Sequence, residues 1–122
     1  TNPHATLASI QQLSQLTDKK NIILLAGGIL QVPQLEQDFI SILQQLKTVI
    51  LFGRDAIKIA RFLENTQITE NLKLAVQLAK NIASKENIIL LSPFCASFDQ
   101  FLDYKVRGKL FIDLMNAYKY NY

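Results

Sequence analysis

Three short runs of aliphatic residues stand out along the chain, and none of them alternates between apolar and polar positions. They cover residues 21–26, 48–52 and 87–91. A strand that is covered on both faces shows such a continuous apolar pattern, which is typical of parallel sheets. A weaker run at Gln67-Ile68 is a candidate fourth strand. The pattern therefore predicts a mainly parallel sheet with buried strands.

Helical spacing fills the segments between these runs. Apolar residues recur three, four and seven positions apart over residues 35–46, 56–63 and 72–83, and Thr69 is a plausible N-cap of the last of these helices. Pro3 suits the first turn of an opening helix through about Leu13, and Arg107 to about Tyr118 is typical of a closing helix. Strands that alternate with helices predict a doubly wound α/β fold, with helices on both faces of the sheet, in a single domain over residues 1–122.

Composition narrows the class of protein. The chain is 49% hydrophobic and 19% charged, as in ordinary soluble globular domains. A single cysteine forms no internal disulfide, which fits a reducing cytoplasm, and no Cys/His cluster has metal-ligand spacing. The net charge of +3 is too small and too scattered to indicate a nucleic-acid partner. No apolar run approaches the roughly 20 residues of a membrane-spanning helix.

Loops that follow strands carry the candidate chemistry. Gly27-Gly28, Gly53-Arg54 and residues 92–97 each follow a predicted strand, so a parallel sheet gathers them at one rim, where ligands bind. The glycine pair completes no dinucleotide fingerprint, and the chain has no Gly-Lys-Ser/Thr phosphate-binding loop. Composition alone favours a tight turn for that pair, because glycine adopts positive φ readily.

No catalytic residue follows from the residue types themselves. Ser92 and Ser97 have no base nearby in the sequence, since the only histidine, His4, lies in the predicted first helix. Cys95 is more typical of a small buried hydrophobe, and Asp99 and Arg107-Gly108 are typical of helix starts. We therefore expect no catalytic and no metal-binding residue within this chain.

One longer motif points to a family. The run from Leu90 to Phe101 reads L-L-S-P-F-C-A-S-F-D-Q-F, and Arg107-Gly108 follows after a short spacer. Together with Thr1-Asn2-Pro3 and Gly27-Gly28, it resembles the Rossmann-like C-terminal domain of the Mur ligases, above all those that add D-glutamate in peptidoglycan synthesis. The resemblance covers essentially the whole chain but only part of such an enzyme. It implies that the N-terminal and central domains lie outside these 122 residues.

The resemblance also implies roles for individual residues. Thr1 matches a threonine that contacts the α-carboxylate of the amino acid, and Ser97 matches the serine that hydrogen-bonds its side-chain carboxylate. Tyr104 stands at a phenylalanine whose backbone helps to hold the same group. Gln31 stands where the family has a carboxylate-binding lysine, so this position lacks the family's charge. The other matched motif positions are Gly27, Gly28, Ser92, Cys95, Asp99 and Arg107.

The function implied by the resemblance is ATP-dependent addition of D-glutamate to UDP-N-acetylmuramoyl-L-alanine. ATP and Mg²⁺ would be bound mainly by the missing domains, and we expect a cytoplasmic monomer. An alternative is a non-catalytic binding or scaffold module derived from a Mur ligase, which the neutral Gln31 favours. A dinucleotide-binding oxidoreductase domain would share the fold class but lacks the glycine fingerprint.

Overall fold

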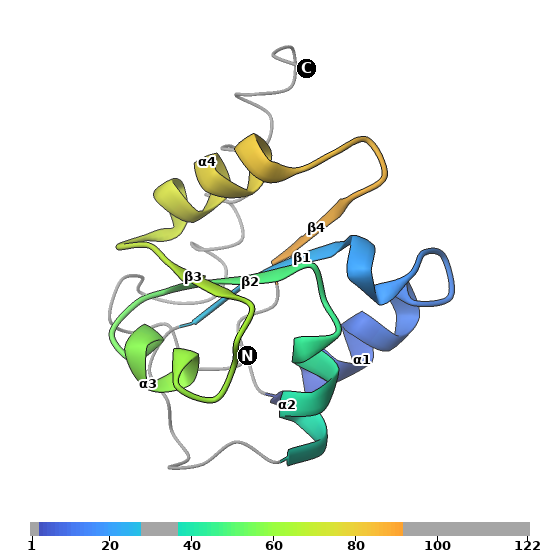
Figure 1. Ribbon diagram of the computed structural model, residues 1–122, viewed down its shortest axis with the longest axis horizontal. Helices are drawn as coiled ribbons and strands as arrows, with labels where there is room; N and C mark the ends of the chain where they lie inside the picture. The colour runs from blue at the N-terminus through green and yellow to red at the C-terminus, as the bar shows by residue number, and fades with distance from the viewer. Residues whose placement is uncertain (1–2, 28–36, 92–122) are drawn as a thin grey trace.

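The computed structural model describes residues 3–27 and 37–91, which alternate between helices and strands (Figure 1). The ordered elements are α1 (Pro3–Leu13), a 3-10 turn η1 (Lys19–Asn21), β1 (Ile22–Gly27), α2 (Gln37–Gln44), β2 (Thr48–Phe52), α3 (Ala56–Ala60), β3 (Thr66–Ile68), α4 (Leu72–Ile82) and β4 (Ile88–Leu91). The predicted α/β class is confirmed, and the predicted closing helix lies outside the described residues.

Within the described residues, four strands form one sheet in the order β3-β2-β1-β4, and every neighbouring pair is parallel. β1 pairs with β2 from Ile23↔Thr48 to Gly27↔Phe52, and with β4 from Ile22↔Ile88 to Leu25↔Leu91. The weak run around Gln67 is a real strand, β3, whose one neighbour among the described strands is β2. The sequence-based expectation of a mainly parallel sheet is therefore confirmed.

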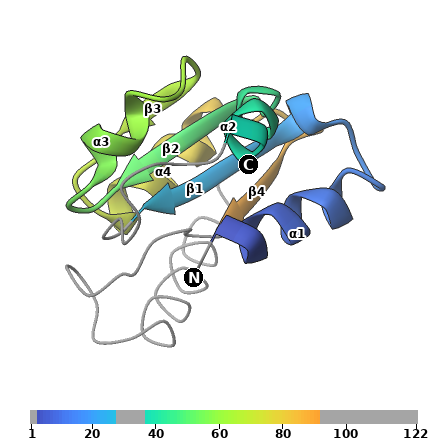
Figure 2. The ribbon, with the colours of Figure 1, turned by 90° about the horizontal axis from the view of Figure 1, so that it is seen from below.

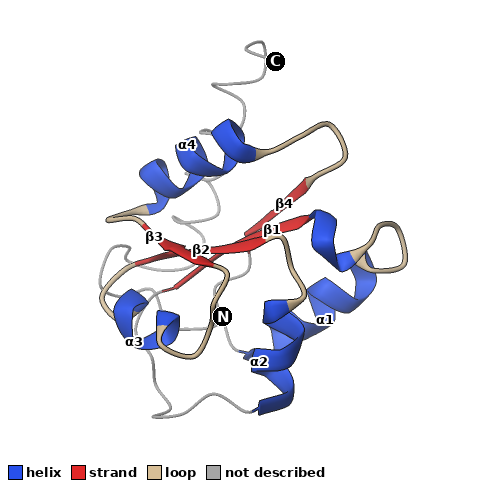
Figure 3. Ribbon diagram, in the orientation of Figure 1, coloured by secondary structure: helices blue, strands red, loops and turns tan. Residues whose placement is uncertain are grey.

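Helices cover both faces of this sheet (Figures 1 and 3). α4 lies on one face, and α1, α2 and α3 lie on the other. The strand residues alternate accordingly, because successive side chains of a strand point to opposite faces. Leu24 and Leu51 belong to the apolar cluster that includes residues of α1, α2 and α3, whereas Leu25 and Phe52 belong to the cluster with α4. Both faces of β1 and β2 are consequently buried, as their unbroken apolar sequence predicts.

The two outer strands are less covered than the sequence suggests. β4 has the apolar sequence Ile-Ile-Leu-Leu, but all four residues are half-buried rather than buried. The expectation that this run is covered as fully as the other two is wrong for the described part of the chain, because β4 there pairs only with β1. β3, at the opposite edge, is half-buried at its first residue and exposed at the next two.

Three helices differ from their predicted limits or caps. α2 ends at Gln44, two residues before the predicted end, and the amides of Gln45 and Leu46 donate to carbonyls three residues back. The helical spacing predicts a helix to residue 63, but α3 ends at Ala60, and the amides of Phe62 and Leu63 then donate to carbonyls three residues back in a tightened turn. Thr69 does not cap α4. Its amide still donates to Leu51 O at 2.8 Å as a continuation of the sheet, and the cap is Asn71, whose Oδ1 accepts from Leu74 N at 2.9 Å.

Polar side chains tie the elements together at the amino edge of the sheet. Asn65 Nδ2 donates to the carbonyls of Leu43 (3.0 Å) and Leu46 (2.9 Å), which closes the end of α2. Lys47 Nζ donates to Asn87 Oδ1 at 2.6 Å and to Ile82 O at 3.2 Å, which links the start of β2 to the turn before β4. These contacts join α2, α4 and the starts of β2 and β4 at the amino edge.

Candidate functional site at the carboxyl edge of the sheet

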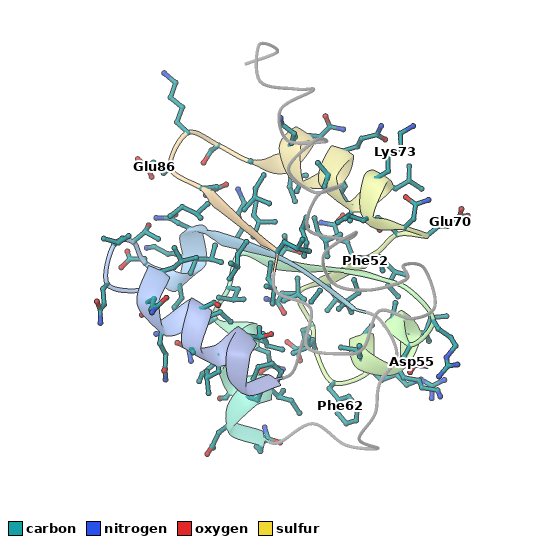
Figure 4. The ribbon with its side chains drawn as sticks, turned by 180° about the vertical axis from the view of Figure 1, so that it is seen from behind. Phe52, Asp55, Phe62, Glu70, Lys73 and Glu86 are labelled. Carbon is teal, nitrogen blue, oxygen red and sulfur yellow. The ribbon has the colours of Figure 1, made fainter. Side chains whose placement is uncertain are left out.

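The carboxyl ends of the strands form the candidate site, because parallel strands all end at the same edge. Gly27, Phe52, Ile68 and Leu91 are the last residues of the strands. Figure 2 shows the sheet from below, with α1 and β4 at one flank and α3 and β3 at the other. In Figure 4, Asp55 and Glu70, which follow β2 and β3, lie on one side of the molecule, and Glu86, which precedes β4, lies on the other.

Gly27 ends β1 with a backbone conformation that requires glycine. Its φ is +152°, and an added Cβ atom would lie 1.8 Å from the carbonyl oxygen of Phe52, its register partner on β2. No side chain fits at that distance, so the absent Cβ lets the two strands stay paired to their ends. Gly53, directly after β2, also has a positive φ of +97°. The sequence-based interpretation, that glycine stands here for its backbone freedom, therefore holds for Gly27.

The order of the strands identifies the position at this edge where a ligand binds most readily. From β1 the chain moves outward through β2 to β3, and then returns to the other side of β1 to form β4. The direction of winding therefore reverses between β1 and β4. In open α/β sheets, ligands bind outside the carboxyl ends of the strands at this switch point. The two segments that leave the sheet there begin at Gly27 and at Leu91, on strands joined by hydrogen bonds.

A buried carboxylate lies at the same edge and was not singled out from the sequence. Asp55 is 3% exposed and precedes α3. Its Oδ1 lies 3.7 Å from Arg54 Nε and 3.5 Å from Lys58 Nζ, whose side chains are largely exposed. Two cations beside one buried carboxylate compensate its charge, because an isolated buried charge is costly. The signal in the sequence is a charged pair, Arg54-Asp55, directly after an apolar strand and a glycine.

The structure describes the edge of the sheet at which the amino acid is predicted to bind, but not the residues predicted to bind it. Thr1, Gln31, Ser97 and Tyr104 lie outside the described residues, as do the motif positions Gly28, Ser92, Cys95, Asp99 and Arg107. What the structure does bring together is Gly27, Gly53-Arg54 and Leu91, at one edge of a parallel sheet. The shared edge agrees with the predicted positions of Gly27 and Gly53-Arg54, whereas the gathering of Gly28 and residues 92–97 there stays a prediction.

Residues 3–27 and 37–91 contain no group of three or more His, Cys, Asp or Glu residues that could hold a metal ion. Over the same residues, no helix is both long enough and apolar enough to cross a membrane.

Known proteins are similar to this chain over nearly its whole length. No family model matches the chain. It is, however, 39% identical over 113 residues to a protein of Hydrogenovibrio crunogenus, and 37% identical over 118 residues to one of Francisella tularensis. A protein of Francisella philomiragia is 38% identical over 122 residues. These alignments cover 91%, 94% and 98% of this chain.

These relatives make the chain homologous to one segment of the Mur ligases, and its all-parallel α/β sheet is consistent with the Rossmann-like domain of such an enzyme. All three relatives bear the name UDP-N-acetylmuramoylalanine--D-glutamate ligase, so within the family the chain is homologous to the ligases that use D-glutamate. The chain spans 25%, 28% and 29% of the lengths of these relatives.

Proposed function

We propose that this chain is the C-terminal, amino-acid-binding domain of a ligase that joins D-glutamate to UDP-N-acetylmuramoyl-L-alanine with consumption of ATP. The observation that carries the proposal is the adjacency of β1 and β4 in a sheet whose winding reverses between them. It supports a ligand site to which the segments after Gly27 and Leu91 both contribute, and these segments hold the family's glycine pair and its serine-rich motif. The D-glutamate ligase names of the relatives support the same substrate.

Such a reaction needs an activated carboxylate and a positioned amine. ATP and Mg²⁺ would supply the activation, by making one carboxylate oxygen a leaving group, and residues beyond this chain would hold them. The part of this domain is to orient the amine of D-glutamate and to exclude water from the site. Orientation converts an encounter of two molecules into a reaction between neighbours, and exclusion of water protects the activated acid from hydrolysis.

The proposed ligands of the amino acid are four residues that offer mainly neutral hydrogen bonds. Thr1 would bind the α-carboxylate, and Ser97 with the backbone of Tyr104 would bind the side-chain carboxylate. Gln31 would reach a carboxylate through its amide, without the charge of a lysine. A lysine ammonium adds the attraction of opposite charges to its hydrogen bond with a carboxylate, which a neutral amide donor does not provide. We therefore expect weaker binding of D-glutamate than a lysine at position 31 would give.

A non-catalytic scaffold derived from the same family is the second candidate, and Gln31 is the observation that favours it. The intact run from Ser92 to Gln100 weighs against it, because a protein that no longer bound the amino acid would not need that motif. An oxidoreductase domain is a weaker explanation, since the relatives bear the names of ligases.

Kinetics of the full-length protein test the proposed site. Ser97→Ala should raise the KM for D-glutamate about five- to thirty-fold, which corresponds to roughly 1–2 kcal/mol. Gln31→Lys should lower it by a similar factor, because it places a positive charge beside the carboxylate. Ser84→Ala is the matched control, since Ser84 is exposed in the turn between α4 and β4 at the amino edge. If neither Ser97→Ala nor Gln31→Lys changes this KM, the D-glutamate assignment is wrong.

A further inference from the structure

A groove of about 670 Å³ lies at the carboxyl end of β3, between α3 and α4, and β3 is an outer strand of the sheet among the described residues. We call it the edge groove. Its carboxyl end is formed by Gly53, Arg54 and Thr69, at the same edge of the sheet as the candidate site. It then follows the outer side of α4 past Leu74 and Leu78. The groove is therefore separate from the switch point between β1 and β4, although it opens on the same edge.

Exposed apolar side chains are concentrated in this groove. Among the described residues, four large hydrophobic residues are exposed, and three of them line the edge groove: Ile57 (62%), Ile68 (50%) and Leu74 (39%). A single exposed aliphatic residue is ordinary on a protein surface, but several that share one groove indicate a surface that another part of a protein covers. The fourth, Leu16, is 80% exposed and lies between α1 and β1, away from the groove.

The backbone of β3 adds a second feature to the edge groove. Val49 N donates to Asn65 O, and Thr69 N donates to Leu51 O, so the odd-numbered residues of this segment face β2. In a parallel pair, the alternate residues direct their amides and carbonyls away from the partner strand. Those of Thr66 and Ile68 therefore face away from β2, and Ile68 lines the groove, so a further extended segment can pair with this edge.

We propose that the edge groove is the docking surface for another part of the same ligase polypeptide, which covers it with an extended, apolar segment. This inference rests on the proposed function. The relatives are more than three times as long as the matched segment, so most of such a ligase lies outside this chain. Those other parts must approach the carboxyl edge to bring the activated carboxylate to the amine. Gly53, Arg54 and Thr69 place the mouth of the groove on that same edge.

A second copy of this chain fits the edge groove less well. Antiparallel pairing of β3 with the β3 of another copy, centred on Gln67, would set Glu64 opposite Glu70 at both ends of the pair. Both residues are exposed. Like charges directly opposite each other destabilise a strand pair, so the charges that bracket β3 disfavour self-association. A different segment, without acidic residues at those positions, avoids this repulsion.

Thiol labelling of the full-length protein tests the docking. Single variants Ile57→Cys, Ile68→Cys and Leu16→Cys are reacted with iodoacetamide, and each rate is read from its own peptide by mass spectrometry, which separates the native Cys95. Each rate is divided by that of the same variant unfolded in urea. The exposed fractions of the three side chains in this domain differ by less than a factor of two. Without docking, we therefore expect similar rates at the three positions.

Docking predicts that positions 57 and 68 react at least about tenfold more slowly than position 16. A smaller difference overturns the proposal. Slower labelling that appears only at high protein concentration also overturns it, because it indicates a second copy. Labelling needs no enzymatic turnover, so the proposed docking and the proposed D-glutamate activity can fail independently of each other.

Discussion

Replacement of Gly27 by alanine tests the structural basis of the carboxyl edge. The alanine methyl group would lie 1.8 Å from Phe52 O, and the backbone would have to keep a φ of +152° or rearrange. Both options disturb the ends of β1 and β2, which carry the segments of the candidate site. We therefore expect Gly27→Ala to be among the most destabilising single-methyl additions in this domain.

The magnitude follows from two contributions. A non-glycine residue held at such a positive φ costs about 1–3 kcal/mol. Forcing a methyl group into a closely packed contact costs about 1–3 kcal/mol more, through a shift of the backbone. The sum of roughly 2–6 kcal/mol is a large part of the total stability of a domain, which is about 5–15 kcal/mol. At about 4 °C per kcal/mol, the Tm falls by roughly 8 °C or more.

Urea unfolding of the 122-residue chain, followed by far-ultraviolet circular dichroism, measures the effect. Ala8→Gly is the reference, because Ala8 is exposed within α1 and its replacement costs about 1 kcal/mol through helix propensity. We expect Gly27→Ala to lower the free energy of unfolding by at least twice as much as Ala8→Gly. A smaller loss for Gly27→Ala than for Ala8→Gly would refute the close approach of the two strands.

Three further predictions concern local structure and activity. Asn71→Ala should lower the free energy of unfolding by about 1 kcal/mol, because it removes the N-cap of α4, and Asn71→Ser should lower it much less. Thr69→Ala should also cost less than Asn71→Ala. If thermal unfolding shows Thr69→Ala to be the most destabilising of the three, Thr69 is the cap after all. Asn65→Ala should lower the free energy of unfolding by about 1–3 kcal/mol, because two carbonyls at the end of α2 lose their donor. Asn65→Asp should be at least as destabilising, since a carboxylate cannot donate to them. An unchanged urea midpoint for either variant would contradict these bonds. The isolated chain should release no phosphate from ATP, because it contains no phosphate-binding loop, and magnesium-dependent release by the purified chain would contradict this.

Periodicity was enough to predict most of the fold. The runs at residues 48–52 and 87–91 form strands because unbroken aliphatic sequence suits a sheet with helices on both faces. β1 is shifted by one residue from its predicted limits, and β4 begins at Ile88, one residue later than predicted. The end of α3 and the cap of α4 could not be predicted in this way. Leu63 continues the apolar spacing and is buried, but it reaches the core from a tightened turn rather than from the helix. Thr69 has the residue type of a cap, yet its amide is held by β2.

The candidate site could be predicted only in outline. The positions of Gly27 and Gly53 after strands place them at one edge, since parallel strands share their carboxyl ends. The strand order, which puts β4 beside β1 and so locates the switch point, is a long-range property that no local pattern contains. The same holds for the partners of Asp55 and for the edge groove, because burial and exposure of single side chains depend on contacts between elements distant in the sequence.

The most direct test of the central claim is the dependence of phosphate release on the amino acid. The full-length protein is supplied with ATP, Mg²⁺ and UDP-N-acetylmuramoyl-L-alanine, and phosphate is measured as D-glutamate or L-glutamate is added. If this chain is the D-glutamate-binding domain of such a ligase, release should rise with D-glutamate to saturation, should not respond to L-glutamate, and should require a higher D-glutamate concentration in Ser97→Ala than in Ser84→Ala. Phosphate release that does not respond to D-glutamate in the unmodified protein would contradict the claim.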